Sequence, residues 1–265
     1  MSVRLPPLTW LYVPADRPDR VEKAIASRAH AVIVDLEDGV APAAKDAART
    51  GLATMLADAR EKPVFVRVNA GSTADLEALE GLAVEGVMVP KVAARGDVPS
   101  VGIPVHCLIE SALGLEAAFE IASAPGVAGI SLGEADLRSE TGALEAGLDW
   151  ARARIVNAAV AAGLPRPPQS VYPHIDDREG LARSCKRGRE LGHLGRTAIH
   201  PAQLEVIERA YLPTEGEVEQ ARAMVKQLEV DLGPAALAGG VFVDAAMLGA
   251  ARQVVALAER YGTSG

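Results

Sequence analysis

The sequence predicts an α/β fold, namely a TIM (β/α)8 barrel with a C-terminal helical extension. Short apolar runs alternate with helical patterns eight times between Leu8 and Tyr211, and this alternation is typical of a parallel sheet covered by helices. Eight such units close most naturally into a barrel. A doubly wound open sheet is the alternative, but no Gly-x-Gly-x-x-Gly motif follows the first apolar run.

The predicted strands are apolar runs that lead into polar or charged residues at their C-terminal ends. They cover residues 8–13, 31–38, 63–69, 86–91, 105–109, 127–132, 170–175 and 195–201, of which the seventh is the weakest. Helical patterns follow them. In a barrel of this kind the functional residues lie on the loops at the carboxyl ends of the strands. Catalytic and binding residues are therefore expected at these strand ends.

The tail departs from the repeat, and we expect a barrel domain over residues 1–212 and a helical extension or lid over residues 213–265. The extension contains a small-residue linker over residues 233–240, an apolar stretch ending in Asp244, and a final helix from Ala245 to Tyr261. Because eight units already close the barrel, this tail must pack outside it, cover its mouth, or reach a neighbouring subunit.

Composition excludes several classes of partner. The 265 residues are 49% hydrophobic, which is ample for a core, and the formal net charge of −8 argues against nucleic acid or an anionic membrane as the main partner. A small anionic substrate stays compatible with that charge. The two cysteines, Cys107 and Cys185, form no CxxC motif, so zinc is not expected. The N-terminus has no long apolar segment, and we expect a cytoplasmic protein.

Two acids at the ends of consecutive predicted strands indicate a metal site. Glu110 ends the fifth strand, and Asp136 follows the sixth. Adjacent parallel strands lie about 4.8 Å apart, so the two carboxylates could bind one small hard cation such as Mg²⁺, which prefers oxygen ligands. Either acid could instead cap a helix or pair with a surface cation. Glu134 could also take the place of Asp136, because spacing alone does not decide between them.

A positive charge ends the third predicted strand. Arg67 needs an anionic partner there, since an unpaired buried charge is costly. The partner could be a substrate carboxylate, bound in bidentate fashion, or Asp35 or Glu37 of the preceding strand, or both. Asp35 and Glu37 share a face of that strand. We expect Glu37 or Asp38 to orient a metal-bound water or to pair with Arg67.

Other candidate residues have simpler explanations. Lys45 could contact a phosphate or lie in solvent. Lys91, at the end of the fourth strand, is a conceivable Schiff-base lysine but has no obvious hydrophobic pocket. His200 is expected to cap the helix that follows it. The sequence has no Gly-rich phosphate loop and no Gly-x-Ser-x-Gly elbow.

Together, these motifs resemble the citrate lyase beta-subunit-like family of acyl-CoA lyases. This family is grouped with the malyl-CoA and citramalyl-CoA lyases in the Mg²⁺-dependent aldolase/pyruvate-kinase barrel superfamily. The matching segments come in the family's order over nearly the whole chain. They are residues 11–14, 34–40, Lys45 with Ala48-Arg49, and residues 66–69, 89–91, 108–114, 133–136, 199–203 and 240–244.

The resemblance implies roles for individual residues. Glu110 and Asp136 would be Mg²⁺ ligands, Arg67 would hold the carboxylate of a keto acid, and Glu37 would support Arg67 and bound water. Asp244 would be the general acid/base, often supplied to a neighbouring subunit's site in relatives that have this tail.

Substrate contacts are also expected from residues around the metal ligands, namely Arg67, Glu110, Gly133, Lys45 and Arg17. The chain departs from the family at the first loop, which contains Ala15 and Arg17, and at Gly195-Arg196-Thr197. These departures concern the details of CoA binding and the acyl preference.

We therefore expect a Mg²⁺-dependent lyase that cleaves a 3-hydroxyacyl-CoA of the citryl-CoA type into a 2-keto acid and an acyl-CoA. Malyl-CoA or citramalyl-CoA could be the substrate instead. Further alternatives are an aldolase acting on free 2-keto acids without CoA, and a subunit active only within a citrate lyase complex. The tail and the resemblance together predict a homotrimer.

Overall fold

The computed structural model describes residues 5–57, 62–230, 235–236, 242–243 and 245–263. Asp244, the expected acid/base, lies outside these residues. The chain divides into two compact units. The larger unit comprises Pro6–Ile207, and the smaller comprises Glu208–Gly265 together with Met1–Leu5. We describe each unit by itself.

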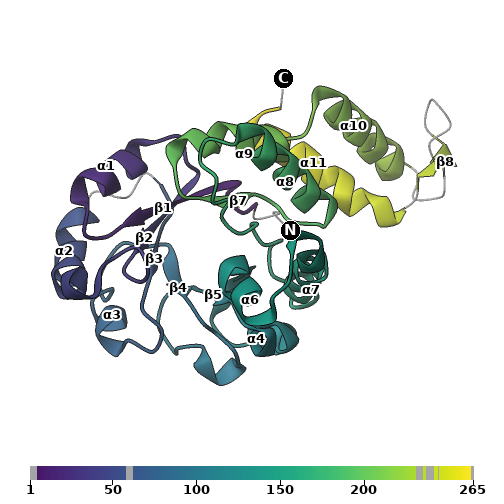
Figure 1. The fold of residues 1–265 in the computed structure, drawn as a ribbon. Helices are drawn as coiled ribbons and strands as arrows, with labels where there is room; N and C mark the ends of the chain where they lie inside the picture. Colours follow the sequence, from purple (N-terminus) through teal and green to yellow (C-terminus); the bar gives the residue numbers. More distant parts are fainter. Residues whose placement is uncertain (1–4, 58–61, 231–234, 237–241, 244, 264–265) are drawn as a thin grey trace. The chain divides into compact units, whose positions relative to one another are not determined.

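The larger unit is an α/β fold built on one parallel sheet of seven strands, which curls around its own interior (Figure 1). The strand order is β6-β5-β4-β3-β2-β1-β7. The strands are β1 (Thr9–Pro14), β2 (Ala31–Asp35), β3 (Val64–Arg67), β4 (Gly86–Val89), β5 (Val105–Ile109), β6 (Val127–Leu132) and β7 (Arg196–Ala198). Consecutive strands from β1 to β6 are neighbours, so their carboxyl ends meet along one edge of the curl.

Helices connect the strands, and α1, α2 and α3 follow the outer side of the curl in Figure 1. The helices are α1 (Pro18–Ala26), α2 (Lys45–Met55), α3 (Thr73–Glu77), α4 (Ala112–Glu116), α5 (Ala118–Ala122), α6 (Glu134–Thr141), α7 (Leu148–Ala161), α8 (Arg178–Glu190) and α9 (Leu204–Tyr211). Side chains of Ser72, Ser111 and Asp177 cap α3, α4 and α8 and satisfy amides that the helices leave free.

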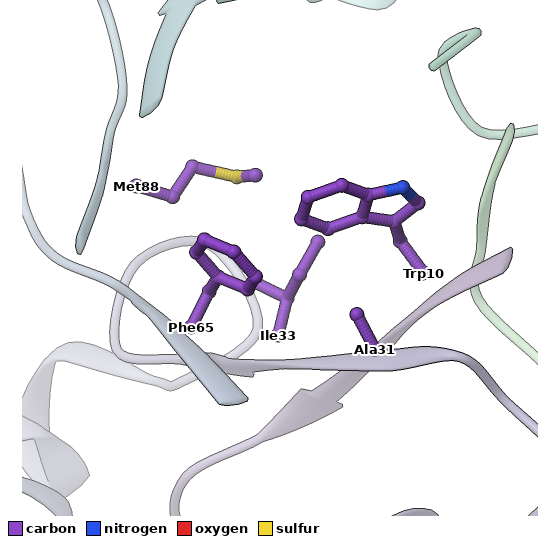
Figure 2. Close-up of a cluster of buried hydrophobic side chains, with 5 residues drawn as sticks. All are labelled: Trp10, Ala31, Ile33, Phe65 and Met88. Carbon is purple, nitrogen blue, oxygen red and sulfur yellow. The ribbon is translucent and has the colours of Figure 1, made fainter. Parts of the chain in front are cut away.

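Alternate residues of each strand point to opposite faces, and on one face they form the core cluster drawn in Figure 2. Trp10, Ala31, Ile33, Phe65 and Met88, from four neighbouring strands, are all buried there. The rings of Trp10 and Phe65 lie 4.8 Å apart between centroids. The other face carries buried aliphatic residues that suit a helical cover, among them Val32, Val34, Val64, Val66, Val87 and Val89.

The strand predicted over residues 170–175 is wrong. Within the described chain this segment forms no ladder, and only the preceding Gln169 makes a single parallel bridge, to Arg196 of β7. Prolines precede it at positions 165, 167 and 168, and Pro173 lies within it; proline has no backbone N–H to donate to a ladder. The Ser170 side chain nevertheless donates to the carbonyl of Leu132 at the end of β6.

Two helical details are not visible in the sequence pattern. The helical segment between β5 and β6 is divided at Ala117 into α4 and α5. Helix α6 was not predicted, because only Leu137 of its eight residues is buried and the apolar period is therefore too weak to see. It begins directly after Gly133 and carries Asp136 in its first turn.

The smaller unit contains α10 (Glu215–Val230) and α11 (Leu248–Tyr261), with short strands β8 (Ala235–Ala236) and β9 (Phe242–Val243) between them. The two helices pack together through a cluster formed by Ala221, Met224, Leu228 and Ala251. In the described part of the chain, no helix combines the length and the apolar character needed to cross a membrane.

Candidate functional site

The candidate site lies at the carboxyl ends of the strands, next to the core cluster. Asp35 follows Ile33 by two residues, and Arg67 follows Phe65 by two, so both point to the same face as the cluster. Asp35 and Arg67 are also register partners between β2 and β3. The sheet therefore forces a carboxylate and a guanidinium side by side.

Arg67 forms the internal ion pairs that the sequence allowed. Its Nε and Nη2 donate to the two oxygens of Asp35 at 2.7 and 2.6 Å, and Nη1 lies 2.9 Å from Oε2 of Glu37. Asp38 is further away, at 3.9 Å. Of the two acids that follow Asp35, Glu37 is therefore the close partner of Arg67, and Asp38 is not.

Asp35 is itself fixed by the loop that follows it. Its oxygens accept hydrogen bonds from the backbone N–H groups of Glu37 and Gly39, at 2.9 and 2.8 Å. A Cβ at Gly39 would lie 2.5 Å from the Asp35 Oδ2 atom, so only glycine allows this close approach. The loop therefore holds Asp35, and Asp35 holds Arg67.

The ring of Tyr12, on β1, lies beneath the guanidinium, with the Arg67 Cζ atom 5.0 Å from the ring centroid. Burial raises the pKa of Tyr12 above its ordinary range, although the charge of Arg67 opposes this. Burial alone would lower the pKa of Arg67, but the bonds to Asp35 more than offset it, so the pKa is raised. Arg67 is therefore a permanent cation and Tyr12 a neutral phenol.

Lys91 completes this row of charges. Its Nζ atom lies 3.1 Å from Oε1 of Glu37, and this interaction raises the pKa of Lys91. A Schiff-base lysine needs a neutral amine at working pH. The ion pair with Glu37 favours the protonated form of Lys91, so Lys91 does not suit that role. Glu37 lies between two cations, yet its burial raises its own pKa.

Glu110 stands directly after β5 and is buried, with only 7% of its surface exposed. Its Oε2 atom accepts no hydrogen bond from the residues that the structure describes. Burial, together with the charges of Glu37 and Asp136, raises the pKa of Glu110 to about 7. A buried carboxylate oxygen without a donor is costly, so Glu110 is a strong candidate to receive a cation.

Gly133 allows Glu110 to occupy this position. A Cβ at residue 133 would lie 2.4 Å from Cγ and 2.8 Å from Oε1 of Glu110, which no side chain could tolerate without displacing Glu110. The backbone N–H of Gly133 also donates to the carbonyl of Ile109 at 2.8 Å. Gly133 therefore contacts the predicted metal ligand itself.

Asp136 and Glu134, which the sequence could not separate, have different surroundings. Asp136 is exposed in the first turn of α6, and its charge acts on Glu110. Glu134 accepts two hydrogen bonds from Arg152 of α7, at 2.9 and 2.6 Å. A carboxylate bound on both oxygens by a guanidinium is occupied, which leaves Asp136 as the available oxygen donor.

Arg152 was missed by the sequence reasoning. It is only 3% exposed and also pairs with Glu145 at 2.7 Å and Asp149 at 3.1 Å. This network ties α6 to α7. The sequence gives an indirect signal for Arg152. Glu134 and Asp136 are both acids near one strand end, and the one that is not a metal ligand needs a cationic partner.

The remaining predicted residues lie further from this cluster or are occupied. Lys45, at the start of α2, donates to Oδ1 of Asn69, and Asn69 in turn donates to the buried Asp75 at 2.6 Å. Arg17 lies exposed in the loop between β1 and α1. His200 accepts a hydrogen bond from the N–H of Ala202 at 3.2 Å, which confirms its predicted capping role.

Oxygen donors dominate the site, and no group of three or more histidine, cysteine, aspartate or glutamate side chains in the described residues could hold a metal. Glu110 and Asp136 could therefore supply two ligands at most. This arrangement fits a cation that keeps several positions for water or substrate, as Mg²⁺ does.

Comparison with known proteins agrees with this geometry. Residues 8–103 and 100–201 match the model of the family described as HpcH/HpaI aldolase/citrate lyase. The chain belongs to this family. Because the family is one of aldolases and citrate lyases, and its members similar to this chain include a citrate lyase subunit beta-like protein and an L-malyl-CoA/beta-methylmalyl-CoA lyase, the chain is a carbon–carbon lyase.

Two relatives and one solved structure illustrate the membership. A (3S)-malyl-CoA thioesterase of Cereibacter sphaeroides is 35% identical, over 94% of this chain and 93% of its own. A citrate lyase subunit beta-like protein of Mycobacterium tuberculosis is 36% identical, over 90% and 91%. The crystal structure of the M. tuberculosis protein CitE with magnesium, acetoacetate and coenzyme A superposes with a TM-score of 0.83 and 36% identity, covering 97% of this chain and 99% of that one.

Proposed function

We propose that the chain is a Mg²⁺-dependent acyl-CoA lyase that cleaves a 3-hydroxyacyl-CoA into a 2-keto acid and an acyl-CoA. The observation that carries this proposal is Glu110, a buried carboxylate with an unpartnered oxygen, beside the exposed Asp136 and the fixed Arg67. Family membership and the similarity to a protein solved with magnesium, acetoacetate and coenzyme A support it.

The donor set fits Mg²⁺. Glu110 and Asp136 supply hard oxygen ligands, and the metal would satisfy the Glu110 oxygen that has no described hydrogen-bond donor. A bound Mg²⁺ supplies Lewis-acid chemistry, lowering the pKa of a coordinated hydroxyl. The repulsion between the charges of Asp136 and Glu110, which raises the pKa of Glu110, would be offset by a bound cation.

Arg67 would bind the carboxylate of the keto acid. A guanidinium carries five N–H donors. Two of them donate to Asp35, and the Nη1 atom forms an ion pair with Glu37. The N–H groups that do not donate to Asp35 could bind a substrate carboxylate. Asp35 and Glu37 would hold Arg67 in one orientation, and this preorganisation favours developing negative charge near it.

In the proposed reaction a general base takes the proton of the substrate hydroxyl, the C–C bond breaks, and a keto acid and a thioester enolate form. The α-carbon of the enolate then takes a proton, which we assign to the carboxylic acid of Asp244. This assignment rests on the resemblance of residues 240–244 to the family tail. We propose that Asp244 comes from a neighbouring copy of the chain in a homotrimer.

We also propose that the larger unit is a complete eight-stranded barrel, with residues 167–171 in place of a regular strand. The bridge from Gln169 to β7 and the bond from Ser170 to the end of β6 support this closure. Residues 213–265 would then form the C-terminal helical extension. Arg17, Lys45 and Gly133 stay as proposed substrate contacts.

Thioester hydrolysis is a second candidate, because the 35%-identical relative is named a thioesterase. The two reactions share a substrate class and differ in the bond that breaks. Incubating the full-length protein with citryl-CoA, malyl-CoA and citramalyl-CoA, with Mg²⁺ or with EDTA, separates them by mass spectrometry of the products.

We expect Mg²⁺-dependent formation of acetyl-CoA and a 2-keto acid. Free coenzyme A with an intact hydroxy acid would instead establish the hydrolase. Turnover of free 2-keto-3-hydroxy acids alone would indicate an aldolase without CoA. If every substrate stayed intact, the chain alone would not be a lyase, and activity only inside a citrate lyase complex would take its place.

A further inference from the structure

Lys91 has an unusual backbone. Its φ angle is 58°, and it is the one non-glycine residue with a positive φ in the described part of the chain. A side chain in this left-handed region costs free energy, because Cβ crowds the following carbonyl. Such strain is retained where the surrounding structure requires it, and it gathers at functional sites.

The side chain of Lys91 extends to the row of charged side chains that Asp35, Arg67 and Glu37 form. From its position two residues after β4, Lys91 places Nζ 3.1 Å from Glu37 Oε1. Glu37 Oε2 lies 2.9 Å from Arg67 Nη1, and Arg67 binds both oxygens of Asp35. Cations and anions therefore alternate across the ends of three neighbouring strands, β2, β3 and β4.

Lys91 is the accessible end of this row. Its side chain is 53% exposed, whereas those of Glu37 and Arg67 are only 4% and 12% exposed. The Lys91 ammonium is half exposed, so solvent screens its attraction to Glu37. The Glu37 carboxylate is buried, however, and its Oε1 atom would lose its neighbouring cation without Lys91. The strained lysine is therefore linked to the state of Glu37.

We propose that Lys91 is a positioning residue, which holds the Glu37 carboxylate against Arg67 and so fixes the guanidinium for a substrate carboxylate. This inference rests on the proposed function, because it concerns how Arg67 binds a 2-keto acid. Without Lys91, one buried oxygen of Glu37 loses its cation, and Glu37 no longer has a fixed orientation beside Arg67.

The test compares K91G with K91A. Both remove the ammonium, but K91G also removes the Cβ that makes the backbone strained. Binding of oxaloacetate in the presence of Mg²⁺ is measured by calorimetry, and thermal unfolding is measured on the same samples. K23A is the matched control, since Lys23 is an exposed lysine in a surface pair with Asp19.

We expect both Lys91 variants to bind oxaloacetate roughly tenfold more weakly than the wild type, with K23A unchanged. K91A should melt about 2 °C below K91G, because only K91A keeps the strained Cβ. A residue with a merely structural role would lower the melting temperature and leave oxaloacetate binding unchanged.

A double-mutant cycle with E37Q shows whether Lys91 acts through Glu37. If it does, K91G changes oxaloacetate binding little in the E37Q background. Full additivity of the two effects, or wild-type binding by K91G, would overturn the inference and leave the proposed function in place. If the wild type itself bound neither oxaloacetate nor pyruvate with Mg²⁺, the proposed function would fall, and this inference with it.

Discussion

At the residue scale, the proposed metal site depends on the effect of burial on the pKa of Glu110. A carboxyl group that is buried near Glu37 and Asp136 holds its proton more tightly, and its pKa is raised to about 7 from an ordinary 4.5. Arg67 and Lys91 reduce this effect without cancelling it. The folded protein is therefore prepared for a cation at this position, because a divalent ion would replace the proton.

This shift predicts opposite effects of pH on stability and on metal binding. Since the folded pKa lies above the unfolded one, the stabilisation from Glu110 is present at low pH and is lost as the pH rises through about 7. Mg²⁺ competes with the same proton, so its affinity should rise roughly tenfold per pH unit up to that value.

Denaturant unfolding in EDTA at pH 5.5 and pH 8 tests the first effect. E110Q removes the titration, and at pH 8 it should be more stable than the wild type by up to about 3 kcal/mol. Equal pH dependence in E110Q and the wild type would show that Glu110 is not the titrating group.

At the scale of elements, the close contact between the ends of β5 and β6 decides the geometry of the site. Gly133 permits it, since any Cβ there would overlap Glu110. We predict that G133A displaces the Glu110 carboxylate, lowers stability by about 1–3 kcal/mol and weakens Mg²⁺ binding. Thermal unfolding and Mg²⁺ calorimetry check this.

G147A is the control, because its nearest contact would be an ordinary 3.5 Å. A G133A protein that binds Mg²⁺ normally would refute the role given to Gly133.

Much of this geometry could be predicted from sequence because it follows from periodicity. Strands β5 and β6 occupy the predicted residues, and the alternation of side chains places Arg67 beside Asp35. The segment around Gln169 could not be predicted, since its partners are set by prolines and by one side-chain bond to β6. Helix α6 was missed because a long-range ion pair, from Arg152 to Glu134, holds it in place of an apolar face.

At the scale of the whole molecule, the proposed reaction needs a group from the tail. Asp244 lies outside the described residues, and the proposal assigns it to a neighbouring copy. We predict that E110Q and D244N are each inactive alone, and that co-expressed mixtures regain about a quarter of wild-type activity, since a random pairing of equal amounts places the two intact residues together at that frequency.

Activity in the mixture would be measured on purified oligomers whose mass is determined by light scattering. A mass of three chains is expected. No recovery in a mixed oligomer would mean that Asp244 serves its own chain or is not the acid/base. A monomer would contradict the shared site altogether.

The most direct test of the central claim, that Glu110 and Asp136 hold one Mg²⁺, is a calorimetric titration of the metal-free protein with Mg²⁺ at pH 8. The exposed Glu116 of α4 provides the control variant E116Q. We expect one Mg²⁺ per chain in the wild type and E116Q, and an affinity lower by at least about 100-fold in E110Q and D136N. Wild-type affinity in E110Q would contradict it.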